Sequence, residues 1–215
     1  MEFITPPVGF WLKDTVPQDL VQHLWTCIEN KKGEARHTLA GNISHSYAIP
    51  DIQGKFFKYL STLVHAYHSS YGSHPHQTTI AQKKGKWALT LEKLWVNYQK
   101  KGEFNPLHNH TGMYSFVVWM KIPYDTEQER QAEWMSDIKE HERVAGCFSF
   151  TYTNLLGRIN TSTYDLNPQT ENIIVLFPSG LHHQVYPFYT SDEERISISG
   201  NISIDLNHGK HKGNT

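Results

Sequence analysis

The sequence predicts an α+β chain that is mainly β, with a sandwich or jelly-roll core buttressed on one face by N-terminal helices. Residues 17–31 and 52–70 carry apolar side chains at helical spacing. From residue 87 onward, apolar or alternating runs are separated by Gly, Pro, Asn and Ser, as strands are. Helices followed by six or more strands are typical of a sheet with its helices segregated to one side. We expect one domain over residues 1–215.

The helical support of this domain is expected over about residues 15–72. Thr15 and Gln18 match the capping-box pattern, in which two side chains satisfy free backbone amides at a helix start. An extended loop is expected at residues 38–49, between the two helices. Each helix has one apolar stripe, which has to be buried against a neighbouring layer.

The β core is expected over about residues 87–205. Residues 114–122 (YSFVVWMKI) are nearly continuously apolar, as in a strand buried on both faces. The other strands are expected at residues 87–99, 146–155, 172–177, 183–188 and 195–204. The charged segment at about residues 124–145 interrupts the series and predicts a helical insertion. A lid over the barrel mouth and an ordinary solvated surface helix explain this insertion equally well.

Composition excludes several classes of function. The formal net charge is −1, so no electrostatic footprint for nucleic acid or for a membrane surface is present. No apolar run reaches the ~20 residues of a membrane-spanning helix, and the N-terminus does not have the pattern of a signal peptide. Cys27 and Cys147 form no CxxC motif, which favours a reducing compartment. We therefore expect a cytoplasmic protein.

Histidine is frequent, with 14 residues, and one pair among them is placed for chemistry. His108 and His110 lie two positions apart at the mouth of the apolar run. In a strand, residues i and i+2 point to the same face, so both imidazoles can enter one cavity. Two converging imidazoles suit a borderline divalent metal such as Fe, Ni, Cu or Zn. A third ligand is expected from a strand across the barrel.

Residues 177–188 (FPSGLHHQVYPF) contain the candidate third ligand. Adjacent residues of a strand point to opposite faces, so at most one of its two histidines serves the site. We favour His183 as the inward ligand and His182 as its outer neighbour. Pro178 and Gly180 favour a tight turn just before this strand.

Arg195 opens the last predicted strand, with Ser197 on the same face. A buried arginine is costly unless it meets an anion. Its guanidinium grips a carboxylate with two hydrogen bonds, and a serine hydroxyl adds one more. The alternative is an ion pair with a carboxylate of the protein. Asn97 and Tyr114 are further candidates for binding a cosubstrate at the cavity mouth.

In NPLHNH, FPSGLHHQVYPF and ERISISGNI, the chain resembles small 2-oxoglutarate- and Fe(II)-dependent oxygenases with a double-stranded β-helix core. The resemblance covers about residues 90–204. It implies that His108 and His183 bind Fe(II), and that Arg195 with Ser197 binds the distal carboxylate of 2-oxoglutarate. The LAGNI stretch resembles versions carried by tailed phages of marine bacteria, which would place the protein in the host cytoplasm.

The resemblance also implies an enzymatic activity and its cofactors. The chain would be a non-haem iron dioxygenase, acting as a hydroxylase. It would couple the oxidative decarboxylation of 2-oxoglutarate to the oxidation of a substrate. Fe(II), 2-oxoglutarate and O2 are then required, and ascorbate is an auxiliary reductant of such sites.

One position departs from the pattern of most such oxygenases, which use two histidines and one carboxylate. His110 stands where the carboxylate is expected. We favour His110 as a third ligand, so that the catalytic and metal-binding set is His108, His110 and His183. Two alternatives stay open: a carboxylate from elsewhere, such as Glu103, completes the site, or the site has lost its iron chemistry.

Two other classes of function compete with an oxygenase. Gly102 and the His108–His110 pair resemble the first cupin motif, and Pro178, Gly180 and His183 resemble the second. A cupin-type metalloenzyme with three histidines would not use 2-oxoglutarate, and its activity would not need an arginine at the cosubstrate position. The third class is a non-catalytic jelly-roll module for binding or for assembly into a virion.

The partners of the chain are only partly constrained by its sequence. The substrate class is open among peptidyl side chains, amino acids, nucleobases and small metabolites. Residues 3–12 and 76–82 are candidate edge strands, and pairing between such edges would give a homodimer.

Overall fold

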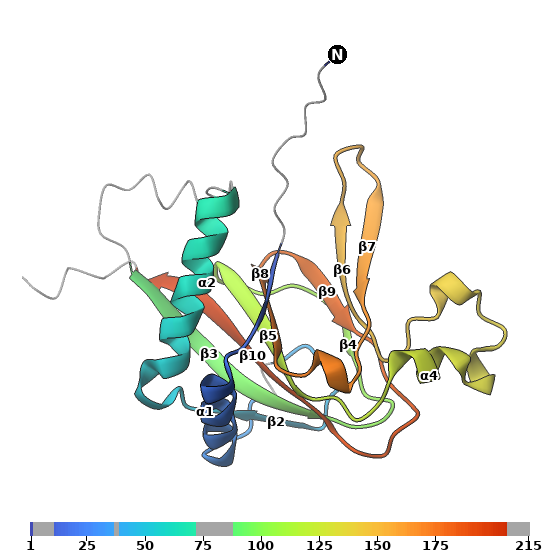
Figure 1. Ribbon diagram of the computed structural model, residues 1–215, viewed down its shortest axis with the longest axis horizontal. Coiled ribbons are helices and arrows are strands. Elements are labelled where there is room, and N and C mark those ends of the chain that lie inside the picture. The colour runs from blue at the N-terminus through green and yellow to red at the C-terminus, as the bar shows by residue number, and fades with distance from the viewer. Residues whose placement is uncertain (2–10, 37–38, 72–87, 206–215) are drawn as a thin grey trace, which may run out of the picture.

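The strands form two antiparallel sheets in the computed structural model, which describes residue 1 and residues 11–36, 39–71 and 88–205 (Figure 1). The six-stranded sheet has the order β1-β8-β5-β10-β3-β2, and the four-stranded sheet has the order β4-β9-β6-β7. The large sheet contains β1 (Leu12–Thr15), β2 (His45–Ala48), β3 (Ala88–Gln99), β5 (Tyr114–Lys121), β8 (Ile173–Pro178) and β10 (Arg195–Asp205). The small sheet contains β4 (Asn105–His108), β6 (Phe148–Thr153), β7 (Ile159–Tyr164) and β9 (His182–Val185).

The chain passes back and forth between the two sheets from β3 onward. Strands β3, β5, β8 and β10 lie in the large sheet, and β4, β6, β7 and β9 lie in the small one. This alternation is how a double-stranded β-helix is built, and it brings β4 and β9 together as neighbours in the small sheet. The predicted mainly β fold with a jelly-roll core is confirmed.

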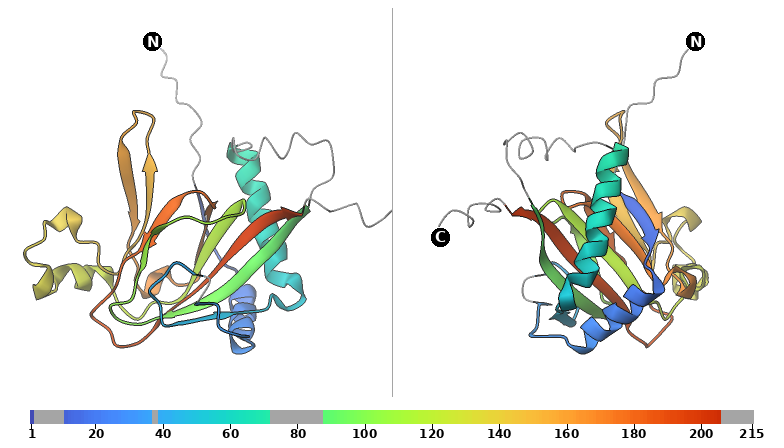
Figure 2. Two further views of the ribbon diagram at one scale, coloured as in Figure 1. Left: turned by 180° about the vertical axis from the view of Figure 1, so that it is seen from behind. Right: turned by 60° about the vertical axis from the view of Figure 1, so that its left-hand side comes forward.

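Two helices, α1 (Gln18–Glu29) and α2 (Lys55–Tyr71), cover one face of the large sheet (Figure 2). Their apolar side chains share one buried cluster with the sheet residues on that face. A short 3-10 turn, η2 (Ile52–Gly54), leads into α2, and another, η5 (Pro168–Thr170), precedes β8. The described helices do not include one that is long and apolar enough to cross a membrane.

The central strand β5 shows why the core has two layers. Phe116 and Val118 point toward the helices, and the ring of Phe116 lies 5.6 Å from that of Phe56 on α2. Val117 and Trp119 point the other way, into the cluster shared with the small sheet. Side chains of a strand alternate between its faces, so a continuously apolar run is what burial on both faces requires.

Several local expectations were wrong. Helix α1 begins after Pro17 with no side-chain cap, because Thr15 belongs to β1 and pairs with Ile173. The expected loop at residues 38–49 contains strand β2. Strand β7 was not expected, because its residues (INTSTY) are polar and mostly exposed. Of the two candidate edge strands, residues 3–10 and 76–82 lie outside the described part of the chain.

The charged insertion contains one short helix, α4 (Thr126–Gln131), and two 3-10 turns, η3 (Glu133–Met135) and η4 (Glu140–Glu142). Figure 1 shows this segment at the opposite end of the molecule from α1 and α2. It is fastened by Glu129, whose buried carboxylate accepts hydrogen bonds from the backbone amides of Tyr189 and Thr190. The insertion is therefore attached to the connection between β9 and β10.

Candidate active site

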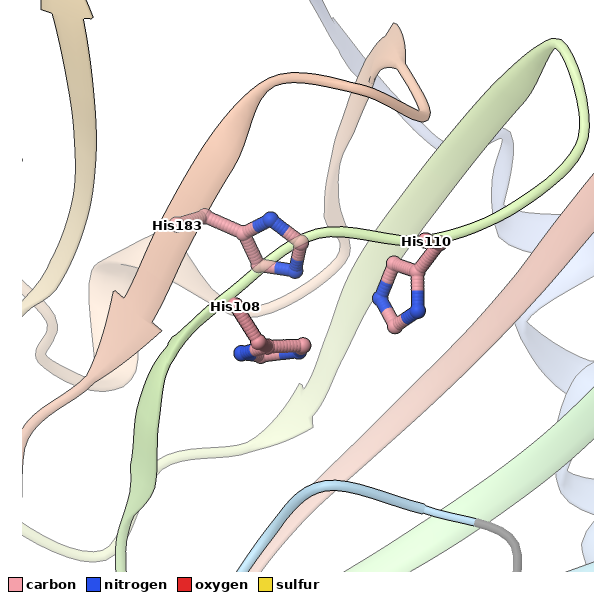
Figure 3. Close-up of side chains that lie close together, drawn as sticks. All are labelled: His108, His110 and His183. Carbon is pink, nitrogen blue, oxygen red and sulfur yellow. The ribbon is translucent and has the colours of Figure 1, made fainter.

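Three histidines meet in the space between the two sheets. His108 is the last residue of β4 and pairs with His183 of β9, and His110 follows two residues later. One ring nitrogen of each lies within 4.8 Å of the others. Figure 3 shows the three rings facing a common point. Among the described residues, this is the only cluster of three or more potential metal ligands, and it contains no carboxylate.

Backbone carbonyls orient two of these imidazoles. Nδ1 of His108 lies 2.7 Å from the carbonyl oxygen of Pro106, and Nδ1 of His183 lies 3.0 Å from that of Leu181. A carbonyl oxygen only accepts, so each Nδ1 carries the proton and each Nε2 keeps its lone pair. Histidines that bind metals are fixed in this way by a second hydrogen bond.

The surroundings keep the imidazoles neutral. Burial lowers the pKa of His108, and burial, the His108 ring and Lys93 lower the pKa of His110 to about 4. Burial and the His108 ring lower the pKa of His183 to about 3. Only a neutral imidazole has a lone pair for a metal. The cluster therefore fits a divalent cation such as Fe(II) at neutral pH.

A buried polar network holds the loop that carries His110. The backbone amide of His110 donates to the carbonyl of Ser179 at 2.8 Å. The backbone amide of Ser179 donates in turn to the carbonyl of Met113 at 3.0 Å. The Oγ of Ser115 is hydrogen-bonded to Ser179 Oγ at 3.0 Å and to Asn201 Oδ1 at 2.9 Å. Residues of β5, of β10 and of the turn after β8 thus meet beside the loop that carries His110.

The two adjacent histidines of β9 lie on opposite faces of the small sheet. His183 is 4% exposed and sits beside His108, whereas His182 is exposed. A tight turn precedes them, closed by a hydrogen bond of 2.9 Å from the amide of Leu181 to the carbonyl of Pro178. This arrangement agrees with the prediction that the turn presents His183 to the interior.

Arg195 is a fully buried cation held by neutral groups. One guanidinium nitrogen donates to the Tyr124 hydroxyl and to the Gly146 carbonyl, and the other donates to Oε1 of Gln99. The guanidinium also lies 5.7 Å from the centre of the Phe188 ring. Among the described residues, no carboxylate forms an ion pair with Arg195. The alternative of an internal salt bridge is therefore not supported.

One cavity connects the three histidines with Arg195. Ser197 and Asn97, both expected at the site, line this cavity, and so does Gln99. Asn97 is 6% exposed and accepts a hydrogen bond of 2.7 Å from the Ser46 hydroxyl. The cavity thus has metal-binding groups at one end and a buried cation at the other.

Two candidates for the site lie elsewhere. Tyr114 shares the helix-facing side of β5 with Phe116, and its hydroxyl is hydrogen-bonded to His68 on α2 at 2.9 Å. Tyr114 does not line the cavity, although Phe116 on the same face does. The carboxylate of Glu103 accepts the backbone amides of Ser44 and Lys100, each at 2.9 Å, so it does not complete the metal site.

The structure adds residues that the sequence did not single out. Gln99 lies opposite Arg195 in the β3–β10 register, a pairing that no local motif signals. Tyr124 reaches Arg195 from the start of the charged insertion, but residues 125–145 do not line the cavity, so a lid there finds no support. Arg36 and residues 39–41 line the cavity instead, and because Arg36 and Ala40 are exposed, this segment marks the cavity mouth.

Comparisons with known proteins agree with this geometry. Residues 93–201, just over half of the chain, match the model of the family described as "Putative 2OG-Fe(II) oxygenase". The matched region contains the three histidines and Arg195. No curated protein matches the chain.

Several solved structures are similar to the chain. A prolyl-4-hydroxylase from Pseudomonas putida is 16% identical with a TM-score of 0.50, over 90% of this chain and 91% of that one. This likeness indicates a shared fold. A viral collagen prolyl hydroxylase from Paramecium bursaria Chlorella virus 1 is 13% identical with a TM-score of 0.48, over 90% and 96% of the two chains. A prolyl hydroxylase from Trichoplax adhaerens is 14% identical with a TM-score of 0.48, and the match covers 95% of this chain and 87% of that one.

Proposed function

The chain belongs to the 2OG-Fe(II) oxygenase family, and we propose that His108, His110 and His183 together hold its iron. Membership makes the protein a non-haem iron dioxygenase that uses 2-oxoglutarate. We assign the distal carboxylate of 2-oxoglutarate to Arg195, with Ser197 and Asn97 as further polar contacts. The reaction we propose is the hydroxylation of a substrate coupled to the oxidative decarboxylation of 2-oxoglutarate.

The observation that carries this assignment is the pairing of two features in one cavity. The imidazoles converge at one end, and a buried guanidinium without a carboxylate partner among the described residues lies at the other. A buried cation of this kind is costly unless an anion compensates it. A cupin-type enzyme that does not use 2-oxoglutarate leaves Arg195 unexplained, so the observation favours the oxygenase.

Each group of the chain has a separate task in this reaction. Bound Fe(II) supplies the redox chemistry that activates O2. The carbonyls of Pro106 and Leu181 hold two imidazoles in the tautomer that leaves Nε2 free. Tyr124 and Gln99 fix the guanidinium plane of Arg195, so that it receives the carboxylate in one orientation. Val117 and Phe148 contribute an apolar part of the cavity wall, which would limit the access of water to the reaction.

The substrate and the auxiliary reductant are proposals that rest on the family. Peptidyl proline is the first substrate to test, because the similar structure from Pseudomonas putida is a prolyl-4-hydroxylase. We propose that ascorbate keeps the iron reduced during turnover. Omitting ascorbate should then shorten the active lifetime of the enzyme without changing its initial rate.

An anaerobic titration tests the metal and cosubstrate assignments together. Apoprotein is titrated with Fe(II) and then with 2-oxoglutarate, and the visible metal-to-ligand charge-transfer band of the chelate is recorded. We expect a band in the wild-type protein. Arg195→Ala should need at least about tenfold more 2-oxoglutarate for the same band, since it loses a charge-assisted pair.

Two further variants distinguish a loss of 2-oxoglutarate binding from a folding defect. Tyr124→Phe removes one hydrogen bond to Arg195 and should weaken 2-oxoglutarate binding about fivefold, with iron binding unchanged. Tyr164→Phe is the matched control, because its hydroxyl accepts from the Trp11 indole outside the cavity. Iron binding without any band would instead support a cupin-type enzyme. Failure to bind iron would reject the three-histidine site.

A further inference from the structure

The charged side chains that line the candidate site are both cations. Arg36 and Arg195 line the cavity, and the described lining residues include no Asp or Glu. The nearby carboxylate of Glu103 is occupied by two backbone amides. The site therefore has cations and neutral ligands but no built-in anion.

Binding of Fe(II) and 2-oxoglutarate does not remove this excess. The carboxylate of the cosubstrate that chelates the metal offsets one of the two metal charges, and the distal carboxylate offsets Arg195. One charge of the metal and the charge of Arg36 stay uncompensated. In a site with two histidines and one carboxylate, the protein carboxylate supplies one more negative charge. Here the imidazole of His110 takes that place, and it supplies a lone pair but no negative charge. The loaded cavity of this chain thus keeps a positive field.

Arg36 adds its positive charge to that field at the cavity mouth. Its side chain is exposed, and the one hydrogen bond that its guanidinium forms with described residues is a long contact of 3.5 Å from Nη1 to the Ser44 carbonyl. No carboxylate of the described residues pairs with it. A guanidinium with most of its donors unused matches carboxylate and phosphate oxygens.

We propose that the compound oxidised at this site carries a carboxylate or phosphate group, and that Arg36 binds this group at the cavity mouth. The inference rests on the proposed metal and 2-oxoglutarate sites, because their charges set the excess. It narrows the substrate from any oxidisable compound to an anionic one. Uncharged apolar substrates gain nothing from this field.

Matched pairs of small probes test the proposal without knowledge of the natural substrate. The probes are terminally blocked aspartate with blocked asparagine, and blocked phosphoserine with blocked serine. The protein is loaded anaerobically with Co(II) and saturating 2-oxoglutarate, and paramagnetic broadening of the probe proton signals measures binding. We expect each anionic probe to bind at least about fivefold more tightly than its neutral partner. Added salt should reduce this preference.

Variants assign the preference to one residue. Arg36→Ala should lower the affinity for the anionic probes about two- to fivefold, as expected for an exposed ion pair, and Arg36→Lys should retain most of it. Arg158→Ala is the matched control, because Arg158 is exposed in the β6–β7 connection and does not line the cavity. A stronger response to phosphoserine than to aspartate would identify phosphate as the recognised group, and the reverse would identify carboxylate.

Three results would overturn the inference: equal binding within each pair, no binding of either member, or a preference that survives Arg36→Ala. The Fe(II) and 2-oxoglutarate titration separates these from a failure of the proposed function. If no charge-transfer band forms, the metal or cosubstrate assignment is wrong. If the band forms but anions are not preferred, only the present inference fails.

Discussion

His110 decides the charge of the candidate metal centre. A neutral imidazole offers the metal a lone pair but does not offset its charge, whereas a carboxylate does both. His110→Asp should therefore bind Fe(II) or Co(II) more tightly than His110→Ala, which we expect to lose at least about tenfold in metal affinity. Isothermal titration of the apoprotein with Co(II) measures both. If the two variants bind equally, His110 is not a ligand.

Ser115 positions His110 without touching the metal. Ser115→Ala leaves the polar atoms of Ser179 and Asn201 without their shared partner, so the His110 loop loses its support. We expect metal affinity to fall about tenfold, as for other residues that orient ligands. The visible spectrum of bound Co(II), which depends on ligand geometry, should change as well.

Ser149→Ala is the control for this variant. Ser149 is as buried as Ser115, but its hydroxyl has no hydrogen-bond partner among the described residues. Removing the same atom there should leave metal affinity and the Co(II) spectrum unchanged. If the two substitutions change metal affinity and the Co(II) spectrum equally, Ser115 contributes to stability in general and does not position His110.

Residues near one another in sequence were easier to place than residues that meet through the fold. His108, His110 and His183 could be grouped because strand alternation and the turn before His183 are local rules. Tyr114 was misplaced because a strand buried on both faces has no polar face to show which side is inward. Gln99 was missed because its partnership with Arg195 depends on the register of β3 and β10.

At the scale of elements, the charged insertion holds the connection between β9 and β10 in place, a role that we call a brace. Its helix α4 holds the β9–β10 connection through Glu129, which also accepts the Thr190 hydroxyl at 2.5 Å. The sequence showed that this segment was helical and charged, but a lid and a brace have the same composition. The residue that indicates a brace is Glu129, whose carboxylate is fully buried. Burial of one residue cannot be predicted from the composition of a charged segment.

Glu129→Gln tests the brace. The amide places a donor where the carboxylate accepted backbone amides, so we expect the free energy of unfolding to fall by about 1–3 kcal/mol. Affinity for 2-oxoglutarate should fall as well, because the braced connection leads into Arg195. Urea unfolding and the charge-transfer titration measure the two effects. Glu127→Gln, an exposed position on the same helix, should stay within about 0.5 kcal/mol of wild type.

At the scale of the whole molecule, the two layers have different tasks. The space between the sheets holds the candidate site, and the cluster between the helices and the large sheet supplies apolar burial with no group in the cavity apart from Phe116. The helical layer was predictable from its periodicity, since both helices carry continuous apolar stripes. How the strands divide between two sheets was not, because strand pairing is set by contacts between distant residues.

This division predicts that stability and site chemistry can be separated by substitution in the helical layer. Leu60 on α2 is fully buried in that cluster, so Leu60→Ala should lower the free energy of unfolding by about 2–5 kcal/mol. Leu155→Ala is the control, because Leu155 is 64% exposed in the β6–β7 connection.

If the chain is one domain, Leu60→Ala should shift a single cooperative transition, followed by circular dichroism of the helices and by Trp fluorescence. Bound Co(II) and 2-oxoglutarate should stabilise the variant as much as wild type, since ligands of the native state act by mass action. Separate transitions for the two probes would mean that the helices and the sheets are independent units.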